Sequence, residues 1–173
     1  MCFLGVDIGG TSVRSLVTDA GGKILGYQRI ARVSHESLWQ AINDCLGTVL
    51  AQSSVVHVEA AVVGAAGAGP TGNHDVCQSV EKAFRAVGLD VTPQVVTDIE
   101  IAYWSAAVWG DGSILGAGTG AIAGRFSVWR CVDRRDGAGW LLGDHGSGYW
   151  IGRKALRAAA ADLDRRGPST TIT

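Results

Sequence analysis

The apolar residues of the first thirty positions fall into three short runs, at residues 3–8, 13–18 and 24–30. A Gly-Gly pair separates the first two runs, and a glycine-containing turn precedes the third. Short apolar runs divided by turn-forming residues are typical of paired strands. The chain is therefore predicted to open with three antiparallel strands.

A helical period follows these strands over residues 36–51. Apolar side chains recur there at spacings of three and four, which places them on one face of an amphipathic helix. The residues of this face are Leu38, Trp39, Ile42, Cys45, Leu46, Val49 and Leu50. The pattern predicts that a helix packs against the opening sheet.

Strand and helix patterns then alternate up to residue 108. Strand-like runs occur at residues 58–63 and 91–96, and a helical stripe of apolar residues lies between them. Thr97 and Glu100 have the Thr-x-x-Glu spacing of a capping box. In this motif the side chain of each residue accepts a hydrogen bond from the backbone N–H of the other at the start of a helix. A helix is predicted to begin there and to run to about residue 108.

A second unit is predicted after a Gly-Asp-Gly turn at residues 110–112. Strand-like residues at 113–116 and 121–129 flank a Gly-Thr-Gly turn, and a closing helix ends near residues 166–168. This order predicts an α/β protein with an N-terminal lobe at residues 1–112. Residues 113–173 are expected to form the beginning of a second, incomplete lobe.

The charge balance and the hydropathy pattern exclude two classes of partner. The 173 residues carry 15 Lys and Arg against 16 Asp and Glu, so no broad basic surface for nucleic acid or anionic lipid is expected. No apolar run reaches the roughly 18 residues that a membrane span needs, and the N-terminus has no cationic leader. A cytoplasmic protein is predicted.

Neither the cysteines nor the histidines have the spacing of a metal-ligand set. The cysteines are Cys2, Cys45, Cys77 and Cys131, and the histidines are His35, His57, His74 and His145. The cysteines are interpreted as buried thiols of a reducing compartment. No role is assigned to the histidines.

The first candidate site is the segment from Asp7 to Thr11, an acid followed by Ile, Gly9, Gly10 and a hydroxyl residue. Glycines let backbone N–H groups approach an anion closely, Thr11 adds a donor, and Asp7 could hold a cation opposite phosphate. The alternative is an ordinary hairpin whose acid caps the turn.

The second candidate site is the glycine-rich run at residues 116–124. It matches the Gly-x-Gly-x-x-Ala form of a dinucleotide fingerprint, and Asp136 follows at the expected distance. That fingerprint requires a helix directly afterwards, whereas residues 122–129 are rich in strand formers. A second phosphate-binding hairpin, formed by Gly118, Thr119 and Gly120, fits this pattern better.

Two further acids are candidates for chemistry. Asp98 falls in the first turn of the predicted helix, where the helix dipole favours its ionised form. Such a carboxylate can accept a proton from a hydroxyl that attacks phosphorus. Asp144 lies in a second glycine-rich stretch that opens a helix. The alternative for both is ordinary charge placement at a helix N-terminus.

The four segments in this order resemble the BadF/BadG/BcrA/BcrD-type ATPases related to N-acetylglucosamine kinase. They are Asp7-x-Gly9-Gly10-Thr11, Thr97-Asp98, Gly118-Thr119-Gly120 and residues 143–152. The resemblance implies a ribonuclease H-like (actin-like ATPase) lobe with a mixed five-stranded sheet. It also implies two lobes that close around ATP and Mg²⁺, and phosphoryl transfer to N-acetylglucosamine or glucosamine.

The resemblance also implies roles for individual residues. Asp98 would be the catalytic base and would contact the sugar, and Asp7 would face the magnesium. The phosphate-binding residues would be Gly9, Gly10, Thr11, Gly118, Thr119 and Gly120. Gly139, Trp140 and Asp144 would lie near the sugar. The expected partner is an amino sugar. The resemblance does not decide whether the protein forms a homodimer.

Three departures from the family pattern bear on this interpretation. His145 stands where the family has an acid, and Ala121 stands where a serine often follows the Gly-Thr-Gly turn. Residues 32–39 lack the asparagine-bearing loop of related kinases, and family members are longer. The chain is therefore expected to be the N-terminal part of a kinase. The alternatives are an ATPase that activates a radical dehydratase, against which the dispersed cysteines argue, and a non-catalytic fragment.

Overall fold

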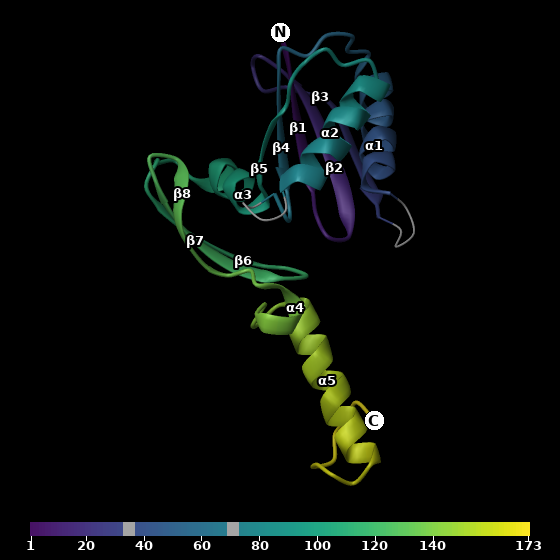
Figure 1. Cartoon of the computed structure of the whole chain (residues 1–173), viewed down its shortest axis with the longest axis vertical. Helices are drawn as coiled ribbons and strands as arrows, with labels where there is room; N and C mark the ends of the chain where they lie inside the picture. The colour runs from purple at the N-terminus through teal and green to yellow at the C-terminus, as the bar shows by residue number, and fades with distance from the viewer. Residues whose placement is uncertain (33–36, 69–72) are drawn as a thin grey trace. The chain divides into compact units, whose positions relative to one another are not determined.

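The protein forms two units, Met1–Ala102 and Tyr103–Thr173, in a computed structural model that describes residues 1–32, 37–68 and 73–173. Thirteen elements occur in these ranges (Figure 1). The N-terminal unit contains β1 (Cys2–Ile8), β2 (Ser12–Asp19), β3 (Ile24–Ala31), α1 (Leu38–Ser53), β4 (Ala60–Ala65), α2 (Asn73–Ala86), β5 (Gln94–Thr97) and the start of α3 (Asp98–Ala106). The C-terminal unit contains the end of α3, then β6 (Gly112–Ala117), β7 (Ala121–Ser127), β8 (Arg130–Asp136), α4 (Gly139–Leu142) and α5 (Gly148–Leu163).

The five strands of the N-terminal unit form one mixed sheet in the order β3-β2-β1-β4-β5. The first three are antiparallel, as their short apolar runs predict, whereas β4 is parallel to β1 and β5 is parallel to β4. Parallel neighbours need a crossover, and α1 and α2 provide it. The predicted α/β class and the mixed five-stranded sheet are confirmed.

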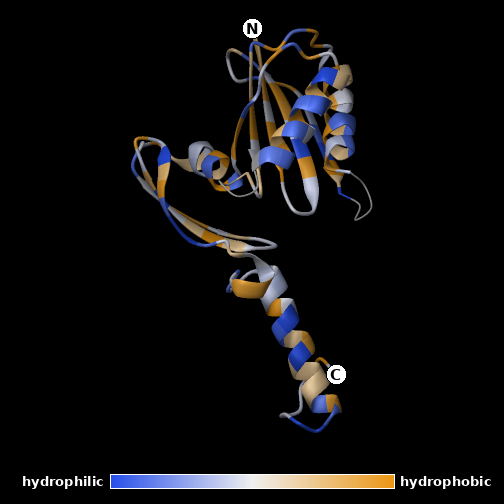
Figure 2. Cartoon of the chain, in the orientation of Figure 1, coloured by the Kyte–Doolittle hydropathy of each residue, from blue (hydrophilic) through white to orange (hydrophobic). Residues whose placement is uncertain are grey.

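The core of this unit lies between the sheet and its helices. Alternate residues of β1 point into it, and Leu4, Val6 and Ile8 are all buried. The predicted stripe of α1 is buried against β2 and β3, with Ile42 and Leu46 fully covered. Hydrophobic colour concentrates on the strands, and hydrophilic colour on the outer sides of α1 and α2 (Figure 2).

The first turns of α3 lie directly on β4. A methyl group added at Gly64 would overlap the side chain of Ile101, so this strand position has room only for hydrogen. Close contact of helix and strand fixes the start of α3 relative to the end of β4. This contact determines where the first residue of α3, Asp98, is held.

The C-terminal unit contains a second antiparallel meander, in the order β6-β7-β8. Phe126 of β7 stacks on Tyr103 of α3, with ring centroids 3.9 Å apart and an interplanar angle of 6°. These two rings and Ala121 are the unit's buried apolar side chains among the described residues. Four leucines of this unit, Leu115, Leu141, Leu142 and Leu156, are all largely exposed.

The sequence pattern predicts strand-like residues through residue 129, whereas β7 ends at Ser127 and a separate strand, β8, begins at Arg130. The structure has a two-residue turn at Val128 and Trp129, with φ of 48° and 65°. Asn and Gly are the usual residues at such positive φ values, so no turn signal was present. The turn is held from outside the hairpin, since Asp111 Oδ1 accepts the Val128 N–H at 2.8 Å and Gly110 O accepts the Trp129 N–H at 2.8 Å.

Within the described residues, no helix has the length and apolar character that crossing a bilayer requires. The predicted helix at residues 36–51 is α1, although Glu36 and half of the segment 32–39 lie outside the described residues. The predicted lobe boundary at residues 112 and 113 follows α3, whereas the two units meet within α3.

Candidate functional site

Three parallel strands of the N-terminal unit end at the same edge of the sheet. The register aligns Asp7 of β1 with Gly64 of β4, and Gly64 with Val96 of β5. The next row contains Ile8, Ala65 and Thr97, and Asp98 follows directly. The carboxyl edge of a sheet is where α/β proteins bind their ligands. Asp7 and Asp98, which are 91 positions apart in sequence, are therefore brought to one edge.

Asp7 lies in a charged and partly covered environment. Its Oδ2 is 3.1 Å from Nη1 of Arg14, its cross-strand partner on β2, and its side chain is 33% exposed. Burial raises the pKa of Asp7, the positive charge of Arg14 opposes this rise, and the negative charge of Asp98 adds to it. Asp7 and Asp98 are thus close enough to repel each other, an arrangement that a bound cation would relieve.

One half of the capping box predicted at Thr97 and Glu100 is present at the start of α3, with Glu100 as the acceptor. The backbone N–H and the Oγ1 hydroxyl of Thr97 both donate to Glu100 Oε2, at 2.9 and 2.7 Å. Asp98 Oδ1 accepts the N–H of Ile99 at 2.9 Å. Because Glu100 caps Thr97, the helix start does not depend on the charge of Asp98.

The turn from Gly9 to Thr11 joins β1 to β2 at the same edge. The Gly9 N–H donates to Ser12 O at 2.9 Å, and Arg32 ties the turn to β3 by donating to Thr11 O and Gly9 O, at 2.9 and 3.1 Å. A Cβ at Gly10 would meet nothing within 4 Å, and Gly10 is not at positive φ. Neither packing nor a positive φ requires glycine at this position, and the backbone is open on the side where a Cβ would stand.

The C-terminal unit contains the second predicted glycine turn, between β6 and β7. The Gly118 N–H donates to Gly120 O at 2.8 Å, and the Gly148 N–H at the start of α5 donates to Gly118 O at 2.8 Å. A Cβ at Gly118 would again meet nothing within 4 Å. A helix N-terminus and an open glycine turn therefore meet here, which is a suitable arrangement for phosphate.

The side chain of Asp144 supports the glycine turn at residues 118–120. Its side chain is nearly buried, and Oδ1 accepts the Ala121 N–H at 3.0 Å. A Cβ at Gly120 would lie 2.9 Å from that same carboxylate oxygen, so the third residue of the turn packs against the acid. The carboxylate of Asp144 thus shapes the glycine turn, while its predicted contact with the sugar stays a prediction.

Asp136 is a further anchor in this region, which sequence reasoning considered only as a nucleotide-binding acid. Its carboxylate accepts the N–H of Asp144 at 2.7 Å and the N–H of His145 at 3.0 Å. These hydrogen bonds, with that from Asp144 the largest cause, lower the pKa of Asp136. Asp136 and Asp144 together connect the end of β8, the Gly-Thr-Gly turn and the approach to α5.

Acidification should release the anchor at Asp136. A carboxylate whose folded pKa is depressed stabilises the fold above its unfolded pKa of about 3.9, and this stability is lost as pH falls through the folded value. We expect the amides of Asp144 and His145 to lose hydrogen-exchange protection below about pH 4, after correction for intrinsic rates. In Asp136→Ala, which removes both acceptor oxygens, this loss should be present already at neutral pH. Unchanged protection in the variant would contradict the anchoring role.

Gly139 and Trp140 begin the short helix α4 near this anchor. Gly139 has a φ of 78°, and Trp140 is 56% exposed. The Trp140 ring centroid lies 5.8 Å from that of Tyr149, and Arg153 Nη1 donates to Trp140 O at 3.1 Å. An exposed indole held by its backbone can stack on the apolar face of a ligand.

The predicted site residues therefore fall into two groups. Asp7, the turn at residues 9–11 and Asp98 gather at one sheet edge of the N-terminal unit, and the other predicted residues gather around the turn at 118–120 and α4. Sequence reasoning missed Arg14 and Arg32, and it considered Asp136 only as a nucleotide-binding acid. Only the pairing register of β1 and β2 could have indicated Arg14, because that register places it opposite Asp7.

The donor set of the N-terminal unit fits a magnesium ion. Mg²⁺ is usually bound by one or two carboxylates, together with waters and substrate phosphates, and rarely by an all-protein cage. Among the described residues no group of three or more His, Cys, Asp or Glu side chains could hold a metal ion. The pair Asp7 and Asp98 beside an open glycine turn matches the first arrangement.

Comparison with known proteins identifies relatives over nearly the whole chain. The BadF/BadG/BcrA/BcrD ATPase family matches residues 4–172. An N-acetylmuramic acid/N-acetylglucosamine kinase of Clostridium acetobutylicum is 30% identical over 177 aligned residues, which cover 98% of this chain and 56% of the relative. An N-acetyl-D-glucosamine kinase of Dictyostelium discoideum is 27% identical, with 99% of this chain and 58% of the relative covered. The chain thus spans little more than half the length of these relatives.

Solved structures share the fold. A candidate N-acetylglucosamine kinase from Chromobacterium violaceum has a TM-score of 0.78 at 24% identity, over 99% of this chain and 61% of the other. A ROK family glucokinase from Streptomyces griseus, solved with glucose and AMPPNP, has a TM-score of 0.61 at 23% identity, over 95% of this chain and 63% of the other. At these identities the likeness establishes the architecture and no more.

Proposed function

Because the chain belongs to the BadF/BadG/BcrA/BcrD ATPase family, we propose that it carries part of an enzyme that transfers a phosphoryl group from ATP to an amino sugar of the N-acetylglucosamine type. The observation that carries the proposal is the gathering of Asp7, Asp98 and the open turn at Gly10 on one sheet edge. The amino sugar is supported by the names of the two relatives described above.

Asp98 is the proposed general base. The attacking sugar hydroxyl must lose a proton during phosphoryl transfer, and a positioned carboxylate can accept it. Asp98 is held at the first position of α3 by the Thr97–Glu100 cap and by the contact of Ile101 with Gly64. Its position is thus fixed by neighbours that take no part in the chemistry.

Asp7 is the proposed acid for the magnesium that accompanies ATP. When bound, Mg²⁺ supplies positive charge that neutralises the phosphate oxygens. The positive charge of Arg14 opposes the rise in the pKa of Asp7, and Arg14 Nη1 donates to Asp7 Oδ2 from the neighbouring strand. The N–H of Gly10 and the hydroxyl of Thr11 are the proposed phosphate donors of this turn, and Gly9, whose N–H donates to Ser12 O, is proposed to shape it around the phosphate.

The C-terminal unit supplies the remaining proposed contacts. Gly118, Thr119 and Gly120 form the second phosphate-binding turn, with Asp144 and Asp136 supporting its shape. Trp140, with Gly139 allowing the chain to turn before it, is the proposed stacking residue for the sugar. We also propose a cytoplasmic location.

The proposed activity is tested by a direct assay of phosphoryl transfer with a protein that contains these site residues. Incubation with ATP, Mg²⁺ and N-acetylglucosamine should yield one ADP per phosphorylated sugar, and glucosamine and glucose should be compared under the same conditions. ADP release that is independent of any sugar would contradict the proposal and favour the dehydratase-activating class of ATPase. Binding of ATP without turnover would favour a non-catalytic fragment.

A further inference from the structure

The peptide unit between Gly9 and Gly10 lies in the middle of the turn that joins β1 to β2. Backbone hydrogen bonds hold both ends of this turn. The Gly9 N–H donates to Ser12 O, and the Arg32 N–H donates to Thr11 O, each at 2.9 Å. In the described part of the chain, no backbone amide donates to Gly9 O, and no group accepts the Gly10 N–H. Since glycine permits rotation on both sides of this peptide unit, backbone contacts alone do not fix the direction in which it faces.

The side chain of Arg32 holds this peptide unit from the end of β3. Ser12 of β2 pairs with Ala31, the last residue of β3, so the next residue, Arg32, is brought beside the turn. Arg32 is half-buried, and its Nη1 donates to Gly9 O at 3.1 Å. A hydrogen bond from a guanidinium is charge-assisted and stronger than one between neutral groups. The side chain of Arg32 therefore determines the direction of the Gly9 carbonyl.

The direction of the Gly9 carbonyl also determines the direction of the Gly10 N–H. Both groups belong to one planar peptide unit, and in a trans peptide they point to opposite sides. The described residues include no cis peptide bond. Because the carbonyl is turned toward Arg32, the Gly10 N–H points away from the guanidinium. This N–H is the proposed phosphate donor of the turn.

We propose that Arg32 is a positioning residue for ATP, whose guanidinium orients the Gly9–Gly10 peptide unit before the nucleotide binds. A rotated peptide unit would present the Gly9 carbonyl oxygen to the phosphate, and this oxygen repels an anion. Preorganisation of the N–H donor raises affinity because less conformational freedom is lost on binding. The inference rests on the proposed function, which places phosphate at this turn.

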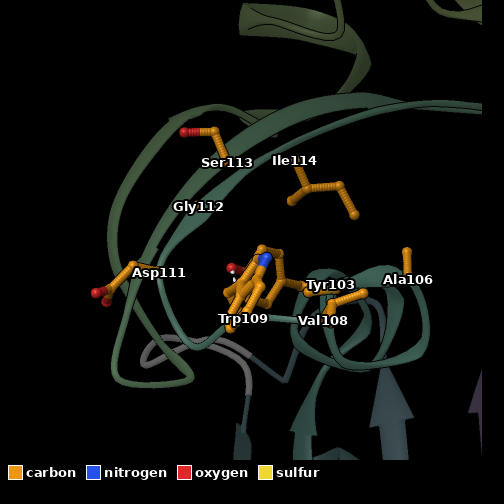
Figure 3. Close-up of a pocket in the computed structure, with 9 residues that line it drawn as sticks. Tyr103, Ala106, Val108, Trp109, Asp111, Gly112, Ser113 and Ile114 are labelled. Carbon is orange, nitrogen blue, oxygen red and sulfur yellow. Dashed lines mark hydrogen bonds between the residues drawn. The ribbon is translucent and has the colours of Figure 1, made fainter.

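A cavity in the C-terminal unit is the alternative place for an anionic ligand, and its lining argues against it. The cavity has a volume of about 240 Å³ and lies between the end of α3 and β6 (Figure 3). Among its described lining residues the only charged one is an acid, Asp111, whose Oδ1 accepts the Val128 N–H at 2.8 Å. The hydroxyl of Tyr103 already donates to Trp109 O at 3.0 Å. The cavity therefore lacks the cation and the unpaired backbone donor that the turn beside Arg32 provides.

The orientation of the peptide unit can be tested by NMR without any ligand. In the isotope-labelled chain, the Gly10 amide resonance is assigned by its absence from Gly10→Ala. Arg32→Met removes the side-chain donor but keeps the backbone N–H that binds Thr11 O. The Gly10 resonance should therefore shift, because the peptide unit then samples both directions. Arg32→Lys keeps a charged donor on a long side chain and should return the resonance most of the way to its position in the parent chain.

Titration of the same proteins with ATP and Mg²⁺ measures the effect on binding. Arg32→Met should weaken ATP binding about tenfold, as expected when the competent direction falls to about a tenth of the population. Arg32→Lys should recover most of this loss. The matched control is Arg85→Met, which also removes one cation but from the exposed surface of α2, where Arg85 pairs with Glu81. It should leave ATP binding and the Gly10 resonance unchanged, and thermal unfolding checks that all three variants fold.

The two measurements separate this inference from the proposed function. If ATP does not move the Gly10 resonance of the parent chain, the phosphate does not bind at this turn, and the proposed site fails together with the inference. If ATP moves that resonance in the parent chain and binds equally well to Arg32→Met, the site stands and the role of Arg32 is overturned. An unshifted Gly10 resonance in ligand-free Arg32→Met would also overturn the role of Arg32, as would an equal loss of ATP binding in Arg85→Met.

Discussion

Replacement of Asp98 with asparagine is expected to lower the turnover number for phosphoryl transfer by about 10²–10⁴-fold, the usual contribution of a general base. The amide oxygen of asparagine can still accept the Ile99 N–H, and the cap of α3 comes from Glu100, so the local structure should survive. The KM for the sugar should change little, because the variant loses an interaction that acts only in the transition state.

Steady-state kinetics with N-acetylglucosamine and ATP measure this effect in the protein that carries these residues. Asp75→Asn is the matched control, since Asp75 is also an acid in the first turn of a helix, α2, but was not predicted to belong to the site. An unchanged turnover number in Asp98→Asn would remove Asp98 from the mechanism. A large loss in Asp75→Asn would show that the effect is not specific.

Much of the N-terminal unit follows from local sequence signals. The helical stripe of α1 indicates which side of the helix is buried. Ile42, Cys45, Leu46 and Val49 of the stripe are buried, whereas Leu38, Trp39 and Leu50 are half-buried. The capping box at Thr97 determines the start of α3. The family predicted from the four motifs is likewise confirmed by the match over residues 4–172.

The turn at Val128 and Trp129 shows what local signals cannot reveal. A β-branched residue and a tryptophan at positive φ contradict ordinary turn preferences, and the hydrogen bonds that hold them come from Gly110 and Asp111, about 18 positions earlier in the chain. Trp104 of α3 also donates to Trp129 O, at 2.8 Å. The hairpin of β7 and β8 is therefore specified by non-local contacts.

The candidate site likewise combines features that local sequence signals indicate with features that depend on non-local contacts. The sequence indicated that Asp7 and Asp98 each end or follow a strand, but their electrostatic coupling depends on the parallel order β1-β4-β5. The support of the second glycine turn by Asp144 and Asp136 depends on a backbone path with positive φ at both acids, which no spacing rule predicts. The candidate site residues could be identified from the sequence, whereas the residues that contact them in the structure could not.

Replacement of Gly10 with alanine is expected to weaken ATP binding at least about tenfold without loss of stability. The added methyl group meets no protein atom within 4 Å, so it should be tolerated by the fold. Removal of a glycine can even stabilise a protein by about 0.4–1 kcal/mol where the backbone conformation suits alanine. The same methyl group would occupy the open side of the turn, where the proposed phosphate approaches the backbone.

Calorimetric titration with ATP and Mg²⁺ and urea unfolding separate these two effects, and Gly64→Ala provides the contrast. Its methyl group overlaps Ile101, so it should lower the free energy of unfolding by about 1–3 kcal/mol, the range typical of overpacked sites. Gly10→Ala should thus lose binding and keep stability, whereas Gly64→Ala should lose stability. If Gly10→Ala binds ATP as the parent chain does, the turn from Gly9 to Thr11 is an ordinary hairpin and the phosphate lies elsewhere.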